Sequence, residues 1–200
     1  MTLVALGFRA HTGWAAMVAL AGDVAEPDVI DRRRIELIAS HERAAVYHAA
    51  RERDLPTARE MVTRAIAEAR SFARGAIDAV VTELGARGCR VVGLGVVLGN
   101  AALPAQLEKI LASHAVVHAA EGQLFRDALS AGGEECGLAV TGIAANHLHQ
   151  EVARGLGLRA LELERRLAAL GKRAGRPWAQ DQKEAALAAW HALARGASGQ

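Results

Sequence analysis

The stretch GFRAHTGWAAMVAL, residues 7–20, places apolar runs on both sides of a polar turn, RAHTG. The lengths of the runs suit strands, and the glycines at positions 7, 13 and 22 disfavour a helix, so the stretch predicts a β-hairpin. The next segment, PDVIDRRRIELI at residues 27–38, alternates polar and apolar side chains over much of its length, as a half-exposed strand does. The chain is therefore expected to begin as a three-stranded antiparallel meander.

After the meander the apolar spacing becomes helical, and helices alternate with two further strands. Residues 54–88 predict a long helix with Asp54 or Thr57 as its cap. Residues 89–100 form a nearly continuous apolar run, which is typical of a strand buried on both faces. Because helices cross between them, the later strands must run parallel. The remaining predicted elements are helices over residues 103–133, 146–157 (with Asn146 as cap), 159–175 and 177–196, and a strand over 137–144.

Composition limits the class of protein. With 200 residues and 52% hydrophobic content, the chain suits one α/β domain over residues 1–157, with a helical extension over 158–200 packed on it. The net charge of the whole chain, +2, is too small to indicate a polyanionic partner by itself. Two distant cysteines do not make a secreted disulfide framework. No uncharged apolar run approaches the roughly 20 residues of a membrane span, so a cytoplasmic protein without membrane association is expected.

The element order resembles that of the ribonuclease H-like superfamily, which includes the RuvC/YqgF-type resolvases and the actin-like ATPases. The hairpin at residues 7–20 is similar to their opening hairpin. Residues 113–157, SHAVVHAAEGQLFRDALSAGGEECGLAVTGIAANHLHQEVARGLG, are similar in layout to the resolvases' helix, fifth strand and following helix. WAQDQKEAALAAWHAL, residues 178–193, resembles their last helix. Over most of residues 3–195, the resemblance implies a mixed sheet of three antiparallel strands, then parallel strands joined by helices, with additional C-terminal helices.

The chain departs from this family at the acidic positions. The resolvases place an aspartate on the first strand, another acid at the end of the fourth, and more on the last helix. Here residues 7–11 are Gly-Phe-Arg-Ala-His, and the fourth strand, Arg90–Leu98, has no acid. Only Asp181, on the last helix, matches. Two-metal cleavage needs carboxylates that hold two cations about 4 Å apart, and one carboxylate does not suffice.

The expected function is therefore that of a nucleic-acid-associated protein of resolvase-like ancestry, which binds phosphates without two-metal cleavage. Two alternatives stay open: an enzyme acting on a small phosphorylated or nucleotide ligand, and a non-catalytic interaction scaffold. Nucleic acid is the expected partner, and self-association is left open. Neither a cofactor nor a catalytic residue follows from the motifs.

The predicted ligand site lies where the parallel strands end, because open sheets of this kind bind ligands beyond the carboxyl ends of their strands. We expect Arg9, His11, Thr12, Asn100 and Asp181 to line this cleft. Arg9 takes the place of the family's acid, and its guanidinium suits bidentate contact with a phosphate.

A second candidate site is the set His114, His118 and Glu121, whose spacing places all three on one stripe of the helix predicted over residues 103–133. This stripe also carries Leu107, Leu111 and Phe125, which predicts that the three polar groups face the interior. Two histidines and a carboxylate can hold a transition metal. They can equally form a general-base pair or a hydrogen-bond network separate from the cleft.

The remaining histidines and the basic clusters are expected to be surface features. His41 and His48 are predicted to lie on a solvated helix face. The basic clusters at residues 32–34 and 165–176 predict a salt-bridged surface, with a phosphate-tracking surface as the alternative.

Overall fold

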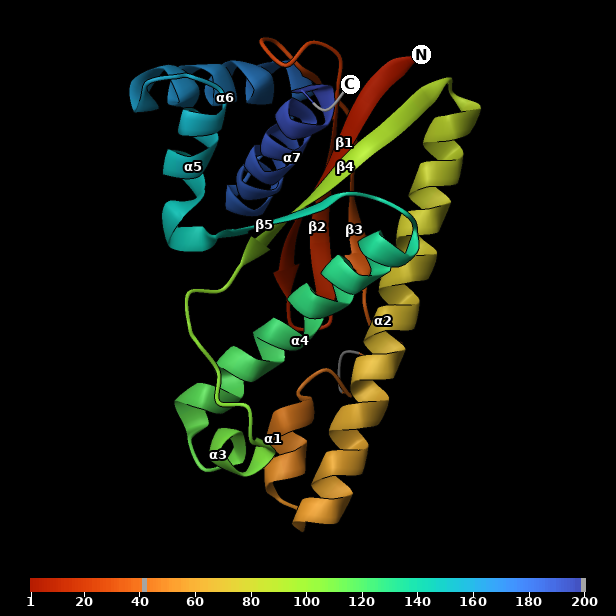
Figure 1. Ribbon diagram of the computed structural model, residues 1–200, viewed down its shortest axis with the longest axis vertical. Helices are drawn as coiled ribbons and strands as arrows, with labels where there is room; N and C mark the ends of the chain where they lie inside the picture. Colours follow the sequence, from red (N-terminus) through yellow and green to blue (C-terminus); the bar gives the residue numbers. More distant parts are fainter. Residues whose placement is uncertain (41–42, 199–200) are drawn as a thin grey trace.

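The computed structural model describes residues 1–40 and 43–198, which form a five-stranded mixed sheet with helices on both faces (Figure 1). The strands lie in the order β3-β2-β1-β4-β5. Neighbours among β1, β2 and β3 are antiparallel, whereas β4 runs parallel to both β1 and β5. This is the ribonuclease H-like arrangement, so the predicted fold class is confirmed. The strands are β1 (Thr2–His11), β2 (Trp14–Ala21), β3 (Asp28–Glu36), β4 (Cys89–Leu98) and β5 (Val140–Ala144).

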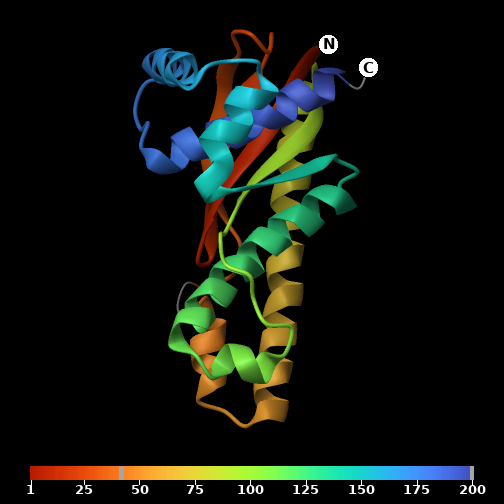
Figure 2. The same cartoon turned by 60° about the vertical axis from the view of Figure 1, so that its left-hand side comes forward.

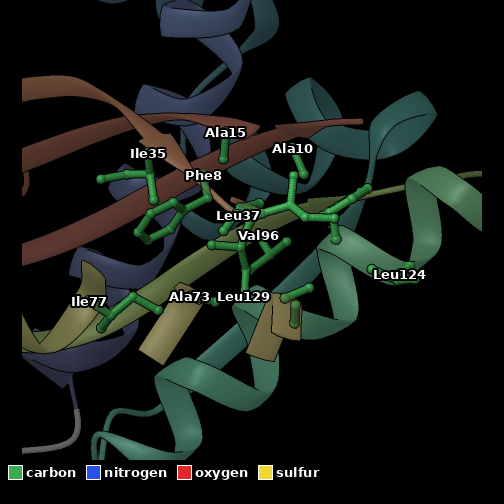
Figure 3. Close-up of a cluster of buried hydrophobic side chains, with 14 of the residues drawn as sticks. Phe8, Ala10, Ala15, Ile35, Leu37, Ala73, Ile77, Val96, Leu124 and Leu129 are labelled. Carbon is green, nitrogen blue, oxygen red and sulfur yellow. The ribbon is translucent and has the colours of Figure 1, made fainter. Parts of the chain in front are cut away.

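Helices α2 (Leu55–Ala86) and α4 (His114–Glu135) cover one face of the sheet. Figure 3 shows how Phe8 and Val96 of the sheet meet Ala73 and Ile77 of α2 and Leu129 of α4. Asp54 is the cap of α2, because its carboxylate accepts a hydrogen bond from the backbone N–H of Thr57 at 3.0 Å.

The opposite face is covered by α7 (Gln180–Ser198), flanked by α5 (Leu148–Gly155) and α6 (Ala160–Ala174). Trp190 of α7 is buried, and its indole N–H donates to the carbonyl of Val24 at 2.7 Å. A core of small and aliphatic side chains joins these helices to β1, β2 and β4. Residues on both sides of position 158 therefore share one core. The division into a domain over residues 1–157 and a helical extension over 158–200 stays a prediction.

Beyond the end of the sheet, α1 (Val46–Arg51) and α3 (Leu107–Leu111) pack against α2 and α4 to form a helical end of the molecule (Figures 1 and 2). The single helix predicted over residues 103–133 is wrong, because Ser113 adopts an extended backbone that separates α3 from α4. No helix in residues 1–40 and 43–198 is long and apolar enough to cross a membrane.

The predicted cap at Asn146 is also wrong. This residue lies in a short 3-10 helix, η2 (Ala145–His147), and the first turn of α5 has no side-chain cap. The backbone N–H of Asn146 instead donates to the side-chain oxygen of Asn100 at 3.1 Å. Asn146 thus links the end of β4 to the start of α5.

Candidate functional site

The candidate site lies at the carboxyl ends of β1 and β4. A two-residue turn, Thr12-Gly13, joins β1 to β2, and its second residue, Gly13, has a positive φ of 84°, which glycine adopts without steric cost. Because β4 runs parallel beside β1, with Arg9 opposite Val97, its end at Gly99 and Asn100 falls next to this turn. The two strands therefore present their last side chains at one edge.

Two glycines allow α7 to reach the same edge. A Cβ at Gly7 would overlap the backbone of Ala185, and a Cβ at Gly95 would overlap that of Ala188, so α7 lies directly on β1 and β4. This close approach places the first turns of α7, with Asp181 and Glu184, over the end of β1.

Each of these acids meets a basic side chain of β1. His11 Nε2 lies 2.9 Å from Asp181 Oδ1, and both side chains are about one-third exposed. Arg9 Nε lies 2.5 Å from Glu184 Oε2, in a more buried ion pair. The other oxygen of Glu184 accepts a hydrogen bond from the amide of Gln180 at 2.8 Å. Both acids of α7 at this edge are therefore engaged by protein groups.

A stack of rings borders the site. His11 lies flat on Trp14, with centroids 4.3 Å apart and an interplanar angle of 11°. The guanidinium of Arg34 lies 4.1 Å from the centroid of the Trp14 ring, and it also pairs with Glu36. These contacts hold the His11 ring in place toward Asp181.

Arg126 of α4 contributes a second guanidinium to the edge. It lies so close to Gly99 that a Cβ there would meet its Nη2 atom at 2.6 Å. Burial lowers the pKa of Arg126 below its usual range, and the charge of Arg9 lowers this pKa further. Among residues 1–40 and 43–198, no carboxylate lies within 4.0 Å of it, and its side-chain hydrogen bonds go to Gln123 Oε1 at 3.3 Å. Arg126 is thus a half-buried cation without an anionic partner in this part of the chain.

The structure pairs two of the predicted cleft residues with each other and gives others different partners. His11 contacts Asp181 directly, whereas Arg9 pairs with Glu184. Thr12 is exposed at the turn, and Asn100 is engaged with the backbone of Asn146. Their role in binding a ligand stays a proposal.

Sequence reasoning missed Glu184 and Arg126. Glu184 follows Asp181 by three residues, so helical spacing alone places it on the same face. Arg126 has no such signal, because its nearness to Gly99 depends on how α4 crosses the sheet.

The histidine cluster in the structure differs from the predicted set of His114, His118 and Glu121. His114 and His118 are exposed rather than inward-facing, because the first turns of α4 extend beyond the sheet, whereas Glu121 further along the same stripe is buried (Figure 1). Glu121 is buried, and it accepts hydrogen bonds from both the ring Nδ1 and the backbone N–H of His48, at 2.8 and 3.2 Å. His48 therefore joins the set, which corrects its prediction as a solvated residue. His41 lies outside the described residues.

The arginines at residues 32–34 are paired with other groups of the protein, as the prediction of a salt-bridged surface requires. Arg33 donates hydrogen bonds to Glu83 and lies within ion-pair distance of Asp31, and both contacts raise its pKa above the usual range. The guanidinium of Arg32 donates to three backbone carbonyls, those of Gly175, Arg176 and Pro177.

Comparison with solved structures agrees with the fold described above. No protein-family model matches the chain, and a search of curated proteins finds no match. Among solved structures, the chain resembles those of RuvC resolvases, with the ribonuclease H-like fold. One is Thermus thermophilus RuvC in complex with a Holliday junction substrate, with 12% identity and a TM-score of 0.54 over 98% of this chain and 96% of that one. Another is Thermus thermophilus RuvC, with 13% identity, the same TM-score and the same coverage. At these identities, the likeness concerns the fold.

Proposed function

We propose that this chain is a nucleic-acid-associated protein of resolvase-like ancestry, which binds backbone phosphates at the ends of β1 and β4 and does not cleave them by two-metal chemistry. The observation that carries the proposal is the guanidinium of Arg126, which has no anionic partner in the described part of the chain and lies beside Arg9 at the edge where the resolvases carry acids. The similar Thermus thermophilus RuvC structure holds a Holliday junction, which makes branched DNA the substrate class to test first.

The electrostatics around Arg126 favour an anion. Glu184 pairs with Arg9, whereas Arg126 has no carboxylate within 4.0 Å in residues 1–40 and 43–198, so a phosphate at Arg126 would supply the missing negative charge. Among the described residues, the side chain of Arg126 donates to one acceptor, Gln123 Oε1, which leaves several of its five N–H donors for a phosphate.

The same electrostatics disfavour the resolvases' metal chemistry. Two divalent cations need several carboxylates, and no carboxylate stands on β1 or β4 at this edge. Asp181 and Glu184 are each paired with a basic side chain, and metal ions placed there would meet the charge of Arg9.

Fluorescence anisotropy with a labelled four-way DNA junction and a linear duplex, over a range of salt concentrations, tests the proposal. Binding should weaken steeply as salt rises. A hydrogen bond to a charged group contributes about 1.5–3 kcal/mol, so Arg126→Gln should weaken binding by roughly 10- to 100-fold at low salt. Arg64→Gln removes the same charge from an exposed ion pair on α2 and serves as the matched control.

Several results would contradict the proposal. One is equal binding by Arg126→Gln and wild type, and another is no binding at any salt concentration. A third is cleavage of the junction with Mg²⁺ or Mn²⁺ that Asp181→Asn abolishes. A rise in melting temperature with a nucleotide, in the absence of DNA binding, would instead favour the small-ligand alternative.

A further inference from the structure

Three histidine rings converge at the helical end of the molecule, away from the strand ends. His48 comes from α1, and His114 and His118 come from the first turns of α4. One ring nitrogen from each lies within 4.8 Å of the other two. We propose that these three side chains bind a transition metal ion, with Zn²⁺ as the expected metal.

The distances suit nitrogen ligands of one ion. Zinc–nitrogen bonds of about 2.0–2.1 Å in a tetrahedral site place two ligand nitrogens about 3.3 Å apart. The Nε2 atoms of His114 and His118 are already 3.1 Å apart. Both of these side chains are exposed, so their rings have room to turn and bring the third nitrogen to the same distance.

The orientations of the rings agree with a shared centre. The centroids of His48 and His114 each lie 4.5 Å from that of His118. The interplanar angles of these two pairs are 63° and 77°, and that between His48 and His114 is 83°. Edge-to-face contact is an ordinary arrangement of neighbouring rings, and here it brings one ring nitrogen of each histidine within 4.8 Å of the other two.

Glu121 occupies the place of the carboxylate that commonly supports a metal-bound histidine. Its Oε1 atom lies 2.8 Å from Nδ1 of His48, so it holds the proton on Nδ1 and leaves the lone pair of Nε2 for a metal. The side chain of Glu121 is only 5% exposed. In our interpretation, Glu121 is therefore a positioning residue rather than a ligand.

The buried charge of Glu121 is a second, independent argument. A buried carboxylate requires compensation. Within the described part of the chain, no lysine or arginine lies within 4.0 Å of Glu121, and its ion-pair partner is His48. A divalent cation on the far side of the His48 ring would supply the missing positive charge.

This ligand set has two consequences. Three protein nitrogens leave one coordination position for water, since tetrahedral zinc takes four ligands. The metal would also join α1 to α4, and α1 is a six-residue helix without a side-chain cap. The inference does not depend on the proposed function, because Arg126 lies eight residues beyond His118, about 12 Å further along the same helix.

Calorimetric titration of Zn²⁺ into the full-length, chelator-treated protein, purified without an affinity tag, tests the site. Wild type should bind one ion per chain, and His48→Ala should bind it at least 10-fold more weakly. Glu121→Gln keeps the shape of the side chain and should weaken binding by about 10- to 100-fold. His147→Ala removes an exposed histidine of η2 and should leave binding unchanged.

Two further measurements separate loss of ligands from loss of folding. Zn²⁺ should raise the melting temperature of wild type and His147→Ala, but not that of His114→Ala, which changes an exposed side chain. Co²⁺ should give wild type the visible absorption of a tetrahedral complex. The proposal is overturned if wild type shows no saturable binding, if His48→Ala and His114→Ala bind Zn²⁺ as wild type does, or if His147→Ala loses binding as they do.

Discussion

Substitution of Gly95 by alanine tests the close packing of α7 that assembles the candidate site. The added Cβ would lie 2.6 Å from the carbonyl carbon of Ala188, whereas carbon atoms in contact sit about 3.5–4.0 Å apart. The helix would have to move away from the sheet by about 1 Å, because the obstacle is backbone rather than a flexible side chain. Such overpacking costs about 1–3 kcal/mol. At 2–4 °C for each kcal/mol, the melting temperature should fall by about 2–12 °C.

Gly93 provides the matched control, because it lies two residues earlier on β4 and faces the same helix. A Cβ there would lie 3.4 Å from the carbonyl oxygens of Ala139 and Ala192, which is ordinary contact. Gly93→Ala should therefore be neutral, or more stable by up to about 1 kcal/mol through a less flexible unfolded chain.

Urea denaturation followed by tryptophan fluorescence measures the free energy of unfolding of both variants, since Trp190 reports on α7 directly. The displaced helix should also carry Asp181 and Glu184 away from His11 and Arg9 and loosen the two contacts that hold these side chains. Equal stability of Gly95→Ala and Gly93→Ala would refute this packing and the assembly of the site that depends on it.

Two further predictions concern titratable side chains whose pKa values differ from their ordinary values. Burial, together with the charge of Arg195, lowers the pKa of His191 below its ordinary value of 6.5, so the unfolded chain takes up this proton first as pH falls. His191→Gln should therefore lose less stability than wild type as pH falls below about 6.5, as measured by urea denaturation, and parallel curves would contradict this. Hydrogen bonds from the backbone and side chain of Thr57 lower the pKa of Asp54 below 3.8, so this cap stabilises the fold above that pH and is lost as pH falls through the folded-state value. At neutral pH, Asp54→Ala should lower the melting temperature and Asp54→Asn should largely preserve it; an equal loss in both would argue against the cap.

The fold could be predicted from the sequence because its signals are local. The hairpin around Gly13, the apolar run of β4 and the helical spacing of α2 each fix an element without knowledge of its neighbours. The break at Ser113 could not be predicted, since the residues around it continue the helical spacing, whereas in the folded chain α3 packs on α1 and α4, and α4 packs on α2.

The candidate sites could be predicted only in part, for a related reason. The sequence predicts Asp181 and His11 as site residues because the fold places their positions at the strand ends. It does not predict Arg126 and His48, because their roles depend on which helices cross near each other. Neither residue has a local motif, and the partner that gives each its role comes from a distant part of the chain.

The packing of α7 also has a consequence for biosynthesis. His11 and Asp181 are separated by 170 positions in sequence, so at about 5–20 residues per second a ribosome makes the second roughly 10–30 s after the first. During that interval, the faces of β1 and β4 that α7 will cover have no partner from the same chain. We therefore expect the nascent protein to depend on shielding of this surface until translation is nearly complete, and the edge proposed to bind phosphate to form last.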